Sequence, residues 1–324
     1  MRVSLEQICT QFTLNREVVR ETFRWEPSEL VPVCANLFCS NGRTADAQAL
    51  REARDLIRHE TGVFSNFRGN LIMPLSCMLS LKEQPEETFR RAQDNYRLLK
   101  EEFRGSTYLA LTAFLLTDRE NVEDKVREGR AIYRRMKEEH RFLTSSEDSV
   151  FAVMLAYSGK GEDALVQDME ACYDLLKQTF HDSDCMQTVS HVLAMDAETP
   201  EKKTMRLISL YEALRQAGLK YGRHYEVATL AALSMMHPDT GRLVEDMRDV
   251  DQYLSTQRGY GVLGYSRKSR LMHAAMLVSD ESMEEKGMQE ATLTSTLSMV
   301  IAQQMAVCAA LAASSAAAAS SSSH

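Results

Sequence analysis

Histidine and carboxylate side chains that could bind a metal ion occur in two short segments of the sequence. One segment is His181-Asp182-Ser183-Asp184, and the other runs from His140 to Asp148. Imidazole nitrogens and carboxylate oxygens are common ligands of zinc, manganese and iron. The candidate metal ligands are His140, Asp148, His181 and Asp184. Alternatively, the acidic groups cap helices, because carboxylates accept hydrogen bonds from the N–H groups at a helix start. The sequence therefore predicts no cofactor and leaves a divalent metal ion open.

Sequence motifs of catalysis do not select an active site. The GxSxG, HExxH and P-loop patterns do not occur. Residues 259–264 spell GxGxxG, but a dinucleotide-binding loop must follow a strand, and this segment follows a helical one. We interpret it as a turn between helices, with anion binding left open by Arg267, Lys268 and Arg270. No catalytic residue is predicted, which favours a protein that is not an enzyme.

The elements that must position these residues repeat along the chain. A long amphipathic segment, a polar break and a short apolar segment recur five times between residues 85 and 279, and once more weakly over residues 44–81. The long segments align on Leu99, Met136, Leu176, Leu214 and Leu254, which are 37 to 40 residues apart. A tyrosine stands three residues before the first four anchors, and Asp251 stands before the fifth. Apolar residues recur with the period of a helix in these segments.

A helical hairpin repeated about every 40 residues is typical of an α-solenoid, since one hairpin cannot bury its apolar face alone. We predict an all-α fold with an array of about six hairpins, an α-solenoid or α-α superhelix of HEAT-like repeat length. An irregular helical bundle is the alternative. Residues 1–43 are predicted to form an N-terminal helical cap and residues 44–290 the array. Residues 291–324 are predicted to be a charge-free, Ala/Ser-rich terminal helix followed by a disordered tail.

Two residue pairs predict where helices begin. Thr144 and Glu147 have the spacing of a capping box. Thr199 is typical of a helix N-cap, and the Pro200 that follows it is typical of the first helical position.

Each short apolar segment begins with a distinctive pair of residues. The pairs are Tyr108-Leu109, Glu147-Asp148, Cys185-Met186, Tyr225-Glu226 and Ser269-Arg270. Since they occupy the same place in successive repeats, we expect them at one level of the stack. The candidate binding residues are Tyr108, His140, Glu147, Asp148, Tyr225, Glu226 and Arg270. Together they would select a cationic or polar ligand.

Charge and composition narrow the possible partners. The chain of 324 residues has 38 Lys+Arg against 46 Asp+Glu and a formal net charge of -8, whereas nucleic-acid-binding proteins usually present an excess of basic groups. We therefore expect no nucleic-acid partner. The seven cysteines form no CxxC pair and the N-terminus lacks the apolar core of a secretory signal, which favours the cytoplasm. No membrane span is expected, because the apolar segment near the C-terminus contains two glutamines and many serines.

Three stretches of the chain resemble a known family. They are HRFLTSSED at residues 140–148 with AVMLA at 152–156, STYLAL at 106–111, and the alanine and serine tail. Together they resemble a family of bacterial proteins, mostly from Firmicutes, that is catalogued only as a domain of unknown function. The resemblance covers most of the chain. It implies a cytoplasmic bacterial protein and no particular activity.

These observations predict a cytoplasmic helical-repeat protein that binds or scaffolds another protein or peptide through a polar groove. Extended recognition surfaces are the usual use of helical arrays. The alternative is a metal-dependent enzyme whose site lies where equivalent loops between helices meet.

Overall fold

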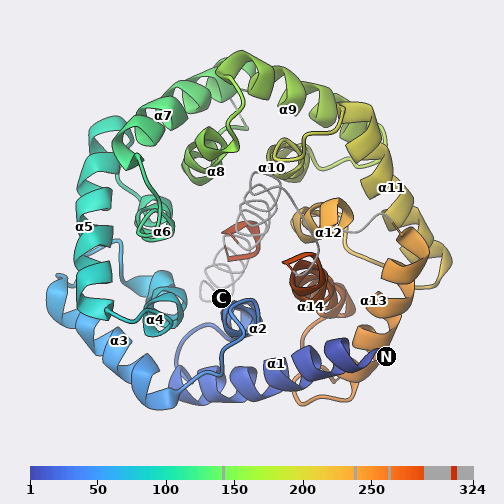
Figure 1. Cartoon of the computed structure of the whole chain (residues 1–324), viewed down its shortest axis with the longest axis horizontal. Coiled ribbons are helices and arrows are strands. Elements are labelled where there is room, and N and C mark those ends of the chain that lie inside the picture. The colour runs from blue at the N-terminus through green and yellow to red at the C-terminus, as the bar shows by residue number, and fades with distance from the viewer. Residues whose placement is uncertain (141–142, 237–238, 262–263, 288–307, 312–324) are drawn as a thin grey trace, which may run out of the picture. The chain divides into compact units, whose positions relative to one another are not determined.

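The computed structural model describes residues 1–140, 143–236, 239–261, 264–287 and 308–311 of the chain. Within these residues all regular structure is helical and no strand occurs (Figure 1). The all-α prediction is therefore confirmed for the described part of the chain. The predicted terminal helix and tail lie outside it, except for residues 308–311, which are helical and buried. None of the described helices has the length and apolar character needed to cross a membrane.

The described residues form two compact units, and each is considered by itself. The first unit contains Leu14–Glu162, and the second combines Met1–Thr13 with residues of the range Asp163–Ala313. Helix α1 (Val3–Thr22) contributes residues to both. In the second unit, Arg2 Nη2 donates to Asp246 Oδ2 at 2.7 Å and to Glu281 Oε2 at 2.6 Å. The predicted boundaries at residues 43 and 290 stay predictions.

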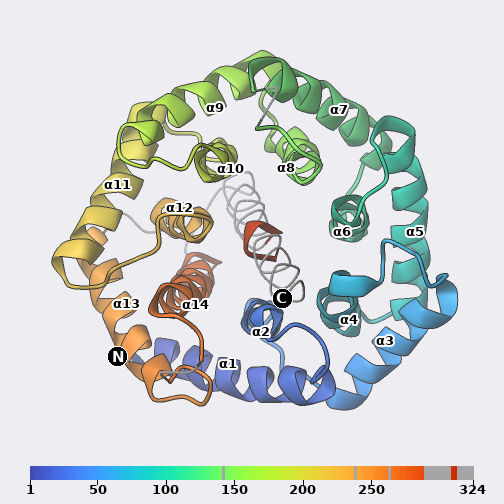
Figure 2. The same cartoon turned by 180° about the vertical axis from the view of Figure 1, so that it is seen from behind.

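The first unit alternates long and short helices. They are η1 (Ser28–Leu30), α2 (Val31–Cys39), α3 (Ala47–Glu60), η2 (Gly69–Leu71), α4 (Ile72–Ser80), α5 (Pro85–Glu102), α6 (Thr107–Leu115), α7 (Val122–Glu139), α8 (Asp148–Leu155) and η3 (Ala156–Ser158). Helix α3 packs against α4, α5 against α6, and α7 against α8, and α6 also packs against α8. In this unit α3, α5 and α7 form one layer and α4, α6 and α8 form another (Figure 2).

The second unit is built in the same way. Its helices are α9 (Glu162–Lys177), α10 (Ser183–Leu193), α11 (Pro200–Gln216), α12 (Glu226–Met236), α13 (Thr240–Ser255) and α14 (Arg267–Gly287). Helix α11 packs against α12 and α13 against α14, while α12 lies between α10 and α14. Helices α9, α11 and α13 form one layer and α10, α12 and α14 the other (Figure 1).

The short second helices of the pairs supply most of the core. Every residue of α8 and of α12 is buried. Their sequences are apolar nearly all round, and each Å² of apolar surface removed from water contributes about 25 cal/mol. Gly129 of α7 allows α8 to approach closely, because a Cβ atom at Gly129 would lie 2.8 Å from Val153 Cα.

In two of the long helices the recurring tyrosine contacts the segment before the next short helix. Tyr133 Oη donates to the Ser145 carbonyl at 3.0 Å, just before α8. Tyr211 Oη accepts from Arg223 Nε at 2.9 Å, just before α12. Tyr96 of α5 instead accepts from Asn66 Nδ2 at 2.6 Å, before α4.

Candidate functional site

The start of α8 buries a carboxylate. Asp148 is 3% exposed, and its Oδ2 accepts a hydrogen bond from the Ser145 N–H at 2.7 Å. Burial raises the pKa of Asp148 to about 7; the Ser145 N–H opposes this rise and the neighbouring Glu147 carboxylate adds to it. The capping pair is therefore Ser145 with Asp148, one residue later than the predicted pair. Thr144 Oγ1 instead donates to the Met136 carbonyl at 3.0 Å.

Two tyrosines surround this acidic start. Tyr108, in the first turn of α6, lies close to the Glu147 carboxylate. Burial and the Glu147 charge raise the pKa of Tyr108 to about 12. Tyr133 bonds the preceding loop from α7. We call Tyr108, Tyr133, Glu147 and Asp148 the acidic cluster. Carboxylates beside aromatic rings are suited to bind a cationic group.

His140 lies at the end of α7, in the segment that leads to the acidic cluster. Its N–H donates to the Met136 carbonyl at 2.9 Å, and its own carbonyl accepts from the N–H groups of Leu143 and Thr144. The His140 side chain is half-buried. These backbone bonds join the segment to α7, and the role of the His140 side chain in binding stays a prediction.

In the second unit, the loops before α10 and α12 meet. Asp182 Oδ2 lies 2.5 Å from His224 Nδ1, and Asp182 Oδ1 caps α10 by accepting from the Cys185 N–H at 3.1 Å. Asp182, Cys185 and His224 therefore form a group that could hold a metal ion. Their ligand atoms all lie within 4.8 Å of one another, and no other such group occurs among the described residues. The first turn of α10 and the two loops therefore bring sulfur, nitrogen and oxygen ligand atoms together.

The electrostatics of the three side chains differ. Burial, together with the Asp182 carboxylate, raises the pKa of Cys185 above its usual range. Burial acts to raise the pKa of Asp182 as well, but hydrogen bonds from His224 and Cys185 outweigh it and lower that pKa. Cys185 is therefore a thiol at neutral pH, whereas Asp182 is a carboxylate.

Buried polar groups hold the loop that carries His224. Glu226 is 4% exposed, and its Oε2 accepts the His224 N–H at 3.1 Å. Tyr221 Oη donates to the Glu226 carbonyl at 3.0 Å. A Cβ atom at Gly222 would lie 2.2 Å from Glu226 Cδ, so the glycine leaves the space that this carboxylate fills. The predicted binding residue Glu226 thus supports the backbone of His224.

The remaining predicted binding residues lie at the starts of α12 and α14. The Tyr225 hydroxyl lies close to Ser269, and burial raises the pKa of Tyr225. Arg270 Nε donates to Asp251 Oδ1 at 2.6 Å. Consecutive helix starts therefore contact each other in both units, through Tyr108 with Glu147 and through Tyr225 with Ser269.

The four predicted metal ligands are divided between the units. His140 and Asp148 belong to the first, and His181 and Asp184 belong to the second, where both are exposed. This four-residue set stays a prediction. The sequence pattern does not single out Asp182, Cys185 and His224, because His224 lies 42 residues beyond Asp182. The signal that could have found them is the equivalence of the two loops in successive repeats.

The GxGxxG segment has a structural role. A Cβ atom at Gly264 would lie 1.8 Å from the Gly259 carbonyl oxygen, which accepts the Tyr265 N–H at 2.8 Å. Gly259 has a φ of 87°, a conformation that glycine adopts readily. Tyr260 Oη lies 2.8 Å from His273 Nδ1 of α14. Gly259 and Gly264 therefore allow the two ends of this segment to approach closely, and residues 262–263 lie outside the described residues.

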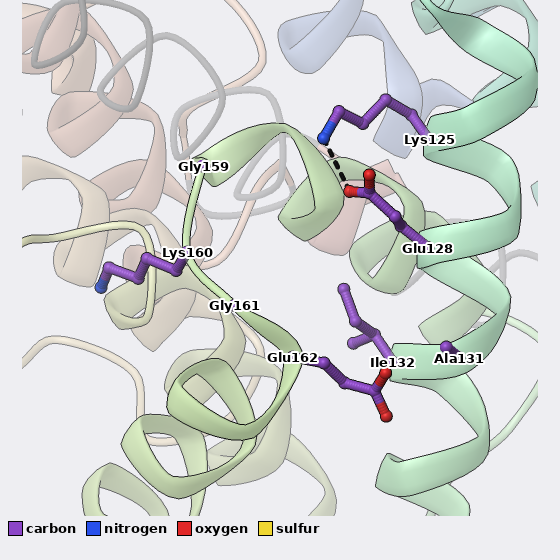
Figure 3. A pocket seen from close by; sticks show the side chains of 8 residues that line it. All are labelled: Lys125, Glu128, Ala131, Ile132, Gly159, Lys160, Gly161 and Glu162. Atoms are coloured by element: carbon purple, nitrogen blue, oxygen red, sulfur yellow. Dashed lines mark hydrogen bonds and ion pairs between the residues drawn. The ribbon is translucent and has the colours of Figure 1, made fainter.

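A pocket of 370 Å³ lies in the first unit between α7 and residues 159–162 (Figure 3). It is lined by Lys125, Glu128, Ala131, Ile132, Gly159, Lys160, Gly161 and Glu162. Lys125 Nζ pairs with Glu128 Oε2 at 2.6 Å, and the Lys160 side chain points away from this pair in Figure 3. The lining contains none of the predicted binding residues and no convergent set of polar groups.

Comparison with known proteins places the chain in a family. A family model described as "Protein of unknown function (DUF4003)" matches residues 15–306. "Uncharacterized protein YeaA" of Bacillus subtilis (strain 168) is 26% identical over 300 residues, which cover 89% of this chain and 88% of that protein. No solved structure matches the chain. The matched residues contain the acidic cluster and also Asp182, Cys185 and His224. The resemblance seen in the helix starts is confirmed, and the chain belongs to the DUF4003 family of proteins of unknown function.

Proposed function

We propose that this protein is a cytoplasmic array of helical hairpins that binds another protein or peptide through the polar starts of its second helices. One observation carries the proposal. Tyr108 at the start of α6 contacts Glu147 at the start of α8, and Tyr225 at the start of α12 contacts Ser269 at the start of α14. These pairs occupy equivalent positions of successive repeats. A series of side chains at the same end of neighbouring helices suits the extended recognition for which helical arrays are used.

The chemistry of the acidic cluster favours a ligand with Lys or Arg side chains. Glu147 is half-buried and Asp148 is buried, so a cation would meet carboxylates that are poorly solvated. A bound cation favours the charged form of Asp148, whose pKa is raised to about 7. Binding should therefore tighten as the pH rises from 6 to 8. The net charge of -8 also favours encounter with a basic partner.

The cysteines support the proposed compartment. All seven are free, and six of them are buried. Free thiols in this number are typical of a reducing environment.

The test is peptide binding by the full chain. Peptides rich in Lys and Arg are selected from a random library on the parent protein and then measured on a Glu147→Gln/Asp148→Asn variant. We expect at least a tenfold loss of affinity. At pH 5, where Asp148 is protonated, the variant should lose about 1 kcal/mol in stability, since amides still cap in part. The matched control is Glu123→Gln/Asp124→Asn in the first turn of α7, where the same residue types are exposed and pair with Arg127.

Two outcomes would count against the acidic cluster. If the Glu147/Asp148 variant binds the selected peptides within twofold of the parent, the cluster is not the binding site. If the α7 control loses as much affinity as the cluster variant, the attraction comes from overall charge.

A second candidate function is a metal-dependent enzyme, favoured by the meeting of Asp182, Cys185 and His224 at two equivalent loops. Three protein ligands and one open position are typical of catalytic zinc sites. A panel of hydrolase substrates tests this with the zinc-loaded chain. Turnover that a chelator and His224→Ala both abolish would support it, and the absence of turnover from the loaded chain would exclude hydrolysis of those substrates.

A further inference from the structure

We propose that Asp182, Cys185 and His224 bind one divalent transition-metal ion, and that zinc fits this site best. The side chains come from the loops before α10 and α12 of the second unit, and their ligand atoms all lie within 4.8 Å of one another. Ligand atoms around a tetrahedral zinc ion are about 3.3 to 3.6 Å apart, given the usual bond lengths. Small side-chain movements are therefore enough to close the site around an ion.

Asp182 can serve the helix and the metal at the same time. Its Oδ1 accepts the Cys185 N–H at 3.1 Å and so holds the first turn of α10. Its Oδ2 faces His224 Nδ1 at 2.5 Å, in a hydrogen bond whose proton a metal ion would replace. The cap fixes the carboxylate relative to Cys185, because both belong to the same helix start.

A supporting layer positions His224 before any ion binds. The buried Glu226 carboxylate accepts the His224 N–H at 3.1 Å, in the space left by Gly222. Tyr221 Oη lies 2.7 Å from Thr229 Oγ1 and also bonds the Glu226 carbonyl. Metal ligands are commonly oriented by such neighbouring hydrogen bonds, and loss of these bonds weakens metal affinity.

The donor set selects the class of ion. A cysteine sulfur and an imidazole nitrogen suit zinc and related transition metals, whereas magnesium and calcium prefer oxygen ligands throughout. The carboxylate is also an accepted zinc ligand. The His224 side chain is 57% exposed, so an ion can reach the site from solvent and a fourth position is open to water or to a substrate.

The metal site deepens the second candidate function, rests on the same three residues and is independent of the acidic cluster. The two claims can fail separately. Stoichiometric metal without turnover would exclude hydrolysis of the tested substrates and leave the metal site intact. Loss of peptide binding at Glu147 and Asp148 would have no bearing on it.

Cobalt(II) binding to the full-length protein tests the site, because cobalt occupies zinc sites and reports a bound thiolate by a charge-transfer band in the near ultraviolet. We expect the parent to bind one cobalt ion per chain and to show the charge-transfer band. Added zinc should displace the cobalt ion and abolish the band. Cys185→Ser should lose the band. His224→Ala and Asp182→Asn should weaken binding at least tenfold, and the asparagine still caps α10.

Two exposed residues away from the site provide matched controls. His59→Ala and Asp174→Asn change exposed side chains of the same types and should bind cobalt within twofold of the parent. Circular dichroism checks that each variant keeps its helical content. The proposal is overturned if the parent retains no stoichiometric cobalt. It is also overturned if the band survives Cys185→Ser, or if the His59 and Asp174 variants lose as much affinity as the His224 variant.

Discussion

Asp148 connects the start of a helix with protonation near neutral pH. Its carboxylate accepts the Ser145 N–H at 2.7 Å, which favours the charged form, yet the side chain is only 3% exposed. Burial prevails because removing a carboxylate from water costs more than one hydrogen bond returns. The adjacent Glu147 adds a like charge. Asp148 therefore holds the start of α8, and its protonation depends on the charges around it.

The contribution of Asp148 to the free energy of unfolding should fall as the pH rises. The folded-state pKa of about 7 lies above the ordinary value of 3.8, so the folded chain holds the proton more tightly than the unfolded chain. The stabilisation that results from this tighter proton binding is complete below about pH 4 and is lost as the pH rises to about 7. Between pH 5 and pH 8 the loss should be about 2 to 3 kcal/mol. Urea unfolding of the parent and of Asp148→Asn at both pH values measures it.

The exposed Asp124→Asn variant is the control for this pH dependence. It should keep the parent's change in unfolding free energy between pH 5 and pH 8, whereas Asp148→Asn should lose most of it. Equal pH dependence in all three proteins would show that Asp148 is already ionised at pH 5.

At the scale of single residues, some of the candidate site could be predicted and some could not. Glu147 and Tyr225 could be selected because repeat position and helical period place them at helix starts. The capping pair moved by one residue to Ser145 and Asp148, since the exact turn geometry depends on the loop that α7 holds. The approach of Asp182 to His224 could not be predicted, because it depends on how two hairpins pack.

At the scale of elements, contacts between the two helices of a pair set where the second one begins. Tyr133 and Tyr211 each bond the segment before the next short helix. In α13 the tyrosine is replaced by Asp251, which accepts from Arg270 Nε at 2.6 Å in the first turn of α14. The break in the sequence repeat is thus a change of bonding partner at an equivalent position, with an ion pair in place of a tyrosine hydroxyl.

Removing the carboxylate of this ion pair should be costly. The Arg270 and Asp251 side chains are only 15% and 11% exposed, so Asp251→Ala leaves a nearly buried guanidinium without its carboxylate. We expect a loss of about 3 kcal/mol in the free energy of unfolding, measured in urea. Asp94→Ala, which breaks an exposed pair with Arg97, should cost less than about 1 kcal/mol.

A double variant separates the charge from the packing. Asp251→Ala/Arg270→Met removes both charges and should recover part of the stability that Asp251→Ala loses. If the double variant is less stable than Asp251→Ala by the full cost of a second deletion, the two residues do not act as a pair.

The close approach of α7 and α8 gives another test at this scale. Alanine normally stabilises a helix interior relative to glycine by about 0.5 to 1 kcal/mol. Gly129→Ala should instead lower the free energy of unfolding by about 1 to 3 kcal/mol, because the added Cβ would lie 2.8 Å from the backbone of Val153. Thermal unfolding checks this. Gly161→Ala, with no atom within 4 Å of the added Cβ, should not lower the melting temperature. A Gly129→Ala protein that melts at or above the temperature of the parent would contradict the close packing of α7 against α8.

Helix boundaries show which sequence signals are reliable. Helix α11 begins at Pro200 as predicted, although the Thr199 side chain forms no capping hydrogen bond. The fixed φ of proline and the helical period are sufficient there. The anchors Met136 and Leu254 lie in the long helices α7 and α13, as the regular apolar stripes of these segments predicted. Burial of the short helices also follows from their composition.

At the scale of the whole molecule, distant parts of the sequence combine in ways that no local pattern indicates. Met1–Thr13 belongs to the same unit as Asp163–Ala313. Arg2 and Ser4 both donate to the Glu281 carboxylate, which is fully buried on α14. A buried carboxylate needs such partners, and the partners lie almost the whole chain away in sequence.

The central claim is that the starts of the second helices are the binding surface of this protein. Hydrogen–deuterium exchange of the full chain, with and without a selected Lys/Arg-rich peptide, tests it most directly. Protection on binding should appear at residues 106–109 and 145–149, the starts of α6 and α8, and little should change at the pocket of residues 125–132 and 159–162. Protection confined to that pocket or to the long helices, with unchanged exchange at residues 145–149, would contradict the claim.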